Sequence, residues 1–143
     1  MNFLLVAVGG ALGAVGRYGI SLIPIRSQFP FLTLITNLVG AVFIGFVVGF
    51  AESRNASSGC ILFLKTGFCG GFTTFSTFSL EAYNLLNEKS YGLCVLYSLL
   101  SVVGCVLGVF VGKKIASVVF RWCCFKVKLK LWIYFAYNWF YKK

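Results

Sequence analysis

The residues best suited to chemistry in this 143-residue chain lie in one run, Gly67–Ser79, which reads GFCGGFTTFSTFS. Glycine, threonine and serine dominate the run, and these residues form helices poorly. We therefore expect the chain to leave the helical conformation near Gly70–Thr74. Backbone carbonyls freed inside hydrophobic surroundings need a polar occupant, and a small cation is the natural one.

Two aromatic residues follow the expected break. Phe75 and Phe78 are three residues apart and share one helix face, while Ser76, Thr77 and Ser79 place hydroxyls on adjoining faces. The ring edge of phenylalanine carries the positive part of its quadrupole, so a dehydrated anion can lie against it without being trapped by a full charge. Core packing is the alternative for the two rings, and the flanking hydroxyls favour the polar interpretation.

Three further polar residues stand inside hydrophobic sequence. Asn37 lies mid-segment close to Thr33 and Thr36, and its amide either donates to an anion or bonds to another helix. Arg17 either snorkels to the membrane interface or lines an aqueous vestibule that concentrates anions. Glu81 is a proton carrier, part of the polar track or, by default, a helix-end residue.

Catalysis is not indicated by these residue types. The chain has no histidine, no catalytic acid pair and no nucleophile beside a base, so we do not expect an enzyme. The six cysteines have neither disulfide nor zinc spacing, and we interpret them as small apolar residues.

The elements that must position these residues are hydrophobic segments. The chain is 59% hydrophobic and 11% charged, with a mean hydropathy of +0.91, far from the balance of a soluble domain. A membrane-spanning helix needs about 20 apolar residues. Four segments qualify, and the loops between them are short enough to make neighbours antiparallel: Phe3–Ile25, Phe31–Ala51, Cys60–Leu80 and Tyr91–Gly112. The first lacks the basic start and cleavage pattern of a signal peptide, so we expect it to remain.

Charge bears on partners and orientation. The formal charge is +10, and eight of the thirteen basic residues lie at or after Lys113 beside hydrophobic sequence, which favours a membrane flank over nucleic acid. Before that point, Arg54 and Lys65 on one side nearly balance Arg26 and Lys89 on the other. Such balance allows insertion in both orientations, whereas the basic tail favours a cytoplasmic C-terminus.

These motifs together resemble a known family. Gly9–Tyr18, Thr33 with Asn37 and Gly40, and above all the block Gly70–Ser79 are similar to the Fluc, or CrcB-like, fluoride channels, over about residues 1–115. The resemblance implies an all-α membrane protein with four transmembrane helices, the third broken mid-membrane, that forms an antiparallel dual-topology homodimer. It implies fluoride-specific, passive export across a bacterial plasma or inner membrane, which protects the cell from fluoride toxicity.

The resemblance also assigns roles to residues. Gly70 and Thr73 would give backbone carbonyls to a structural sodium ion at the dimer centre, and Arg17 would lie at a vestibule. The fluoride pore would be lined by Asn37, Phe75, Phe78, Ser76, Thr77 and Ser79, with Glu81 and Tyr97 as further members of the polar track.

The C-terminal part departs from the family. We expect a channel domain at 1–115 and a basic, aromatic tail at 116–143, in which Leu131–Tyr141 is too short to span and is either interfacial or a nonfunctional, disordered extension. Whether the partner is a second copy or a paralogous subunit stays open. The alternatives are a small dual-topology multidrug exporter, which should carry an acidic residue deep in its first segment, and a noncatalytic membrane subunit.

Overall fold

The computed structural model describes residues 2–54 and 56–141, with side chains described at 2–53 and 56–122. The described residues form helices and short connections and contain no strand, as the sequence predicts. In chain order the elements are α1 (Asn2–Ser21), α2 (Phe31–Arg54), α3 (Ser58–Ile61), the π-helix η1 (Leu62–Cys69), α4 (Gly70–Phe72), α5 (Phe75–Asn87) and α6 (Tyr91–Tyr141).

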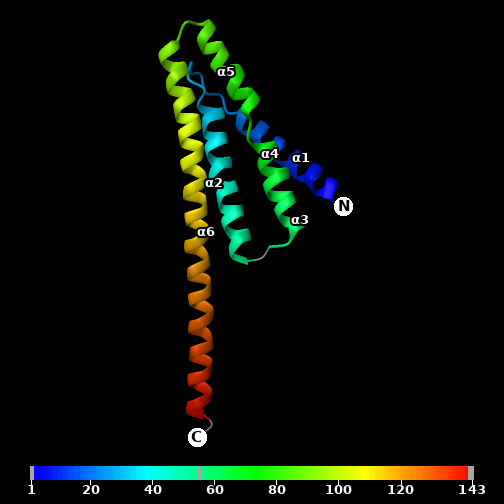
Figure 1. Ribbon diagram of the computed structural model, residues 1–143, viewed down its shortest axis with the longest axis vertical. Coiled ribbons are helices and arrows are strands. Elements are labelled where there is room, and N and C mark those ends of the chain that lie inside the picture. Colours follow the sequence, from blue (N-terminus) through cyan, green and yellow to red (C-terminus); the bar gives the residue numbers. More distant parts are fainter. Residues whose placement is uncertain (1, 55, 142–143) are drawn as a thin grey trace.

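The helices form an antiparallel bundle (Figure 1). α2 packs along α6, and α1 crosses obliquely against η1 and α4, so the bundle consists of two packed pairs joined side by side. Within the described part of the chain, three helices are long and apolar enough to cross a membrane, and their spans are Asn2–Ser21, Phe31–Ser53 and Tyr91–Trp122. They correspond to three of the four predicted segments.

The other predicted segment, Cys60–Leu80, is divided into pieces. It begins in α3, widens into η1, and ends its first helical part with α4 at Phe72. Thr73 and Thr74 are extended, with φ/ψ of −78°/155° and −145°/112°, and α5 begins directly after them. The pieces still run from one end of the bundle to the other, antiparallel to α2 and α6 (Figure 1).

Glycines set the approach of the helices. A β-carbon on Gly13 of α1 would lie 2.8 Å from the amide nitrogen of Phe72, and one on Gly112 of α6 would lie 2.7 Å from that of Phe46. Small residues at such crossings let two backbones meet without an intervening side chain. These glycines therefore set how closely the helices pack.

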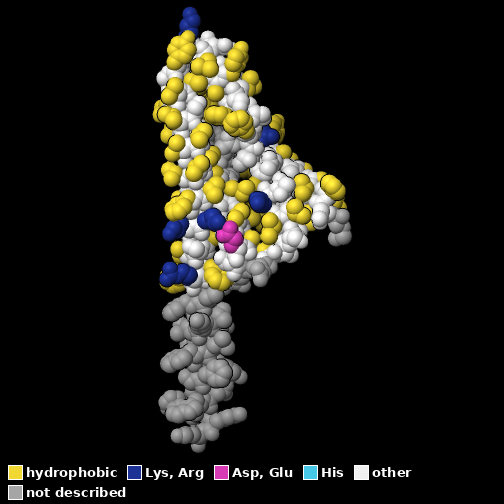
Figure 2. Space-filling view, in the orientation of Figure 1, with side chains coloured by type: hydrophobic (Ala, Val, Ile, Leu, Met, Phe, Trp, Pro, Cys, Tyr) yellow, Lys and Arg dark blue, Asp and Glu magenta, His cyan; other side chains and the backbone are white. Residues whose placement is uncertain are grey.

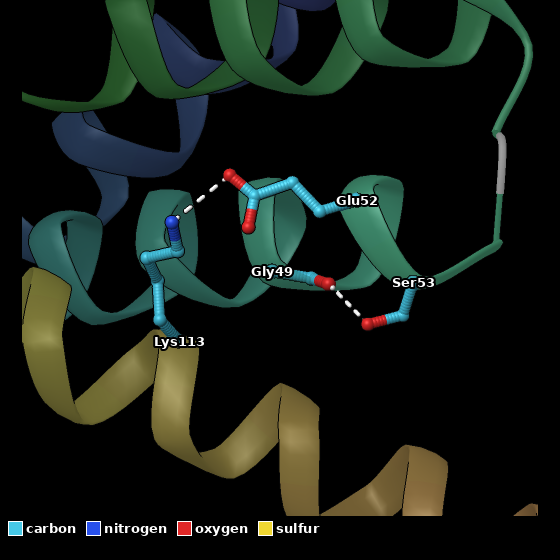
Figure 3. A network of polar contacts seen from close by, with 4 residues as sticks. All are labelled: Gly49, Glu52, Ser53 and Lys113. Atoms are coloured by element: carbon cyan, nitrogen blue, oxygen red, sulfur yellow. Dashed lines mark hydrogen bonds and ion pairs between the residues drawn. The ribbon is translucent and has the colours of Figure 1, made fainter.

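Polar contacts tie the ends of the bundle. At one end, Gln28 donates to the Glu88 carboxylate at 3.1 Å and to the Ser90 hydroxyl at 2.9 Å. At the other, Lys113 of α6 pairs with Glu52 of α2 at 2.9 Å (Figure 3). These contacts define a Glu88 end and a Glu52 end.

The outer surface is largely apolar. Large hydrophobic side chains are exposed along the helices, and they spread over the face seen in Figure 2. One cluster of buried apolar residues lies toward the Glu88 end, around Leu34, Leu85, Cys94 and Tyr97. Because apolar surface on this scale is unfavourable in water, the bundle is built for lipid surroundings.

The predicted tail continues the last helix. The backbone of 116–141 extends α6 without interruption to Tyr141, beyond the rest of the bundle (Figure 1). Side chains after Trp122, and residues 142–143, lie outside what the structure describes. The interfacial placement of Leu131–Tyr141 therefore stays a prediction.

The Gly13 crossing yields a stability test. Gly13→Val should lower the free energy of unfolding by about 1–3 kcal/mol, because the added carbons must push α1 away from α4. Gly19→Val in the same helix is the matched control, since a β-carbon there meets nothing within 4 Å. Thermal unfolding of detergent-solubilised protein measures both, and equal Tm values for the two variants would contradict the close crossing.

Candidate functional site

The interruption of the third segment is held by one side chain from α2. The Nδ2 of Asn37 donates to the carbonyl of Thr74 at 3.1 Å, and the amide of Thr74 donates to Oδ1 of Asn37 at 2.8 Å. One side-chain amide thus satisfies both backbone groups of an extended residue. The interhelical bond that was one interpretation of Asn37 is present, and it fixes the break.

The same contacts give two backbone amides partners other than their helical ones. In a continuous helix, the amide of Thr74 would bond to the carbonyl of Gly70, and that of Thr77 to the carbonyl of Thr73. Here the amide of Thr74 bonds to Asn37, and the amide of Thr77 bonds to the Thr74 hydroxyl at 3.2 Å. The carbonyls of Gly70 and Thr73 are thereby released from the helical pattern.

Arg17 reaches the same place from α1. Its Nε donates to the carbonyl of Gly71 at 3.4 Å, just before α4 ends. A cation at this position interacts favourably with the negative end of a helix. Arg17, which is half-buried, therefore contacts the helix end beside the break.

A cluster of hydroxyls begins α5. The Thr74 side chain caps the helix, donates to the Thr77 hydroxyl at 3.0 Å, and lies 3.2 Å from the Ser76 hydroxyl. Ser79 is exposed and donates to the carbonyl of Phe75 in its own helix at 2.9 Å. The structure therefore brings Ser76 and Thr77 together and leaves Ser79 outside the cluster.

The two predicted aromatic residues lie next to each other but in different surroundings. The ring centroids of Phe75 and Phe78 are 5.4 Å apart at an interplanar angle of 37°. Phe78 also packs on Tyr97, at 5.1 Å, whereas Phe75 is 76% exposed. One ring belongs to the core, and the other projects from the surface beside the break.

Glu81 is held by two hydroxyls from other helices. Thr33 of α2 donates to one carboxylate oxygen at 2.8 Å, and Tyr97 of α6 donates to the other at 2.7 Å. Tyr97 is fully buried. The default interpretation of Glu81 as a helix-end residue misses this contact, which continues the polar residues of α5 toward the Glu88 end.

Sequence reasoning also passed over Ser101. Its hydroxyl is buried and has no hydrogen-bond partner among the described residues. It lies one turn after Tyr97 on α6, and that four-residue spacing is the signal that relates it to the polar residues around Phe78.

A groove of about 390 Å³ joins these features between α2, the interrupted segment and α6. It holds the break, both aromatic residues and the buried serine, and apolar residues make up most of the rest. It is lined by Asn37, Gly40, Ala41, Ile44, Lys65, Cys69, Gly70, Thr73, Thr74, Phe75, Phe78, Ser101, Val102, Cys105 and Val109.

An apolar helical bundle whose groove carries a few polar groups beside an interrupted helix is typical of a multi-pass membrane protein of the transport class. The chain belongs to the CrcB-like family, described as "CrcB-like protein, Camphor Resistance", whose model matches residues 4–113. The resemblance drawn from Gly9–Tyr18 and Gly70–Ser79 is thereby confirmed, and the chain is a protein of the cell membrane.

Three curated relatives of this chain are named fluoride-specific ion channel FluC. The relative from Methanocaldococcus jannaschii is 40% identical over 121 residues, which cover 84% of this chain and 98% of the relative. The relative from Chlorobium chlorochromatii is 42% identical over 124 residues, which cover 85% of this chain and 93% of the relative. The relative from Agrobacterium fabrum is 45% identical over 116 residues, which cover 78% of this chain and 93% of the relative.

Asn37 offers a direct test of the break. Asn37→Ala should lower the free energy of unfolding by about 2–4 kcal/mol, because it leaves the amide and the carbonyl of Thr74 unpaired in an apolar interior. Ser79→Ala, which removes a hydroxyl bonded only within its own helix, is the control and should shift Tm little. Hydrogen exchange at the Thr74 amide that is no faster in Asn37→Ala would contradict the clamp.

Proposed function

We propose that this chain forms a fluoride-specific channel that exports cytoplasmic fluoride by passive electrodiffusion and so protects the cell. Family membership and the relatives' common name support the substrate. The observation that carries the proposal is the Asn37–Thr74 clamp, which holds a helix break open beside a groove with hydroxyl, amide and aromatic groups. Accordingly, the chain is a transport protein and not an enzyme.

Selectivity would come from partial dehydration in the groove. Fluoride needs strong compensation for lost water. The amide of Asn37 lines the groove, and the hydroxyls of Ser76 and Thr77 lie next to the lining residue Thr74, so these groups would offer hydrogen-bond donors. Ring edges of Phe75 and Phe78 add weak positive contacts that do not trap the ion. Chloride, being larger and more weakly hydrated, gains less from such a narrow path.

Sodium is proposed at the break. The carbonyls of Gly70 and Thr73 have lost their helical donors, and Gly70 is exposed, so both oxygens fit a hard cation with oxygen ligands. A bound cation would supply positive charge that offsets the carbonyl ends of α4. The residues of this chain would still make every contact with the anion.

The channel unit is proposed to be an antiparallel pair with the break at mid-membrane. Phe75 projects from the surface, and a β-carbon on Gly70 would meet nothing within 4 Å, so this face is open to a second subunit. Nearly balanced charges before Lys113 support insertion of the same chain in both orientations. The basic tail favours a single orientation of this chain, with the C-terminus in the cytoplasm. A chain held in one orientation would need a paralogous subunit, inserted in the opposite orientation, as its partner.

Export would need no coupled energy. Hydrogen fluoride crosses membranes as a neutral acid and dissociates inside, after which the membrane potential drives the anion outward through an open path. A channel with weak, successive contacts therefore suffices.

Fluoride efflux from liposomes holding the purified chain tests the function. A fluoride electrode should record fast fluoride release without chloride release. Phe78→Ile should slow release about fivefold or more, because loss of one aromatic contact of about 1 kcal/mol acts directly on the barrier. Phe3→Ile, at a ring that is 93% exposed and far along the chain from the groove, should match wild type. Equal chloride and fluoride release by wild type would contradict the proposal.

A further inference from the structure

One basic side chain of the groove has no assigned role. Lys65 lies on η1 and lines the groove, and its side chain is exposed. Because α2 and α6 run opposite to the interrupted segment, Lys65 shares its end of the groove with Ile44 and Val109, the lining residues of those helices closest to the Glu52 end. Phe78 and Asn37 lie toward the opposite end.

The charge of Lys65 is not compensated by any of the three glutamates. There are three acidic residues in the whole sequence. Glu52 pairs with Lys113 (Figure 3), Glu81 accepts from Thr33 and Tyr97, and Glu88 accepts from Gln28. No hydrogen bond or ion pair joins Lys65 to another described residue. An ammonium group in an otherwise apolar stretch is costly unless it faces water or an anion.

The second basic residue near the break is engaged differently. Arg17 donates to the carbonyl of Gly71, so part of its charge interacts with the end of α4. Lys65 in contrast carries a compact charge on a flexible stem and is free to meet a mobile ion. Arg17 thus stabilises the helix end beside the break, whereas Lys65, the basic residue that lines the groove, makes no such contact.

We infer that Lys65 is an electrostatic attractor for the permeating anion at the Glu52 end of the groove. This inference rests on the proposed fluoride channel and adds a residue that sets its rate. An exposed ammonium raises the local concentration of any anion, so Lys65 governs entry, while the hydroxyl and ring contacts near Phe78 govern selection. A second subunit over Gly70 and Phe75 would close the groove and leave Lys65 at its mouth.

Salt dependence separates attraction from structure. Fluoride efflux from liposomes is measured for wild type, Lys65→Gln and Lys65→Arg at about 15 mM and about 300 mM of an impermeant salt. The Debye length falls from roughly 25 Å to roughly 6 Å between these conditions. Lys114→Gln is the matched control, because it removes the same charge at the same end from a side chain that lies over the Phe110 ring outside the groove.

The expected result is a fall of about tenfold in initial fluoride efflux for Lys65→Gln at low salt, largely abolished at high salt, with Lys65→Arg and Lys114→Gln close to wild type. Fluoride over chloride selectivity should be unchanged. A Lys65→Gln rate equal to wild type at low salt, or a loss that salt does not alter and Lys65→Arg shares, overturns the inference while the channel stands. Absence of flux from folded wild type instead removes the channel, and with it this role.

Discussion

A backbone that leaves the helix among apolar side chains must have its polar groups satisfied, and the rest of this structure depends on how that is done at Thr74. The side-chain amide of Asn37 replaces both hydrogen bonds of that residue, and the Thr74 hydroxyl caps the helix that follows. Close glycine crossings bring α1 near enough for Arg17 to reach the carbonyl of Gly71. Helix packing, the helix cap and the charge of Arg17 therefore all act at or beside the two extended residues, Thr73 and Thr74.

The break also explains how a small bundle can offer ligands without strong charge. Hydroxyls, one amide, backbone carbonyls and aromatic rings are individually weak partners for an ion, and together with Lys65 they line a groove whose other residues are mostly apolar. The carboxylate of Glu81 is held by Thr33 and Tyr97, so it continues the polar path without standing free in the groove. Weak and successive contacts suit conduction, because an ion that binds too tightly cannot leave.

Local sequence predicts much of this arrangement. Hydrophobic length gives α1, α2 and α6, and the poor helix propensity of the Gly-Gly and Thr-Thr pairs predicts extended backbone where Thr73 and Thr74 have it. Partners distant in the chain are not predicted in this way. Asn37 and Thr74 are 37 residues apart, and Thr33 and Glu81 are 48 apart, so their pairing depends on how the helices rotate against one another. For Ser79 the sequence predicts a role that the local contact does not favour. Its place on α5 suggests a hydroxyl facing the polar track, but the hydroxyl donates to the carbonyl of Phe75 in its own helix.

The most direct test is fluoride movement in proteoliposomes whose potential is set by a potassium gradient and valinomycin, with no proton gradient across the membrane. Passive electrodiffusion predicts that net fluoride flux follows the imposed potential, reverses when its sign is reversed, and is accompanied by little chloride flux. Fluoride flux that appears only with a proton gradient, or an equal chloride flux, would contradict a selective passive channel.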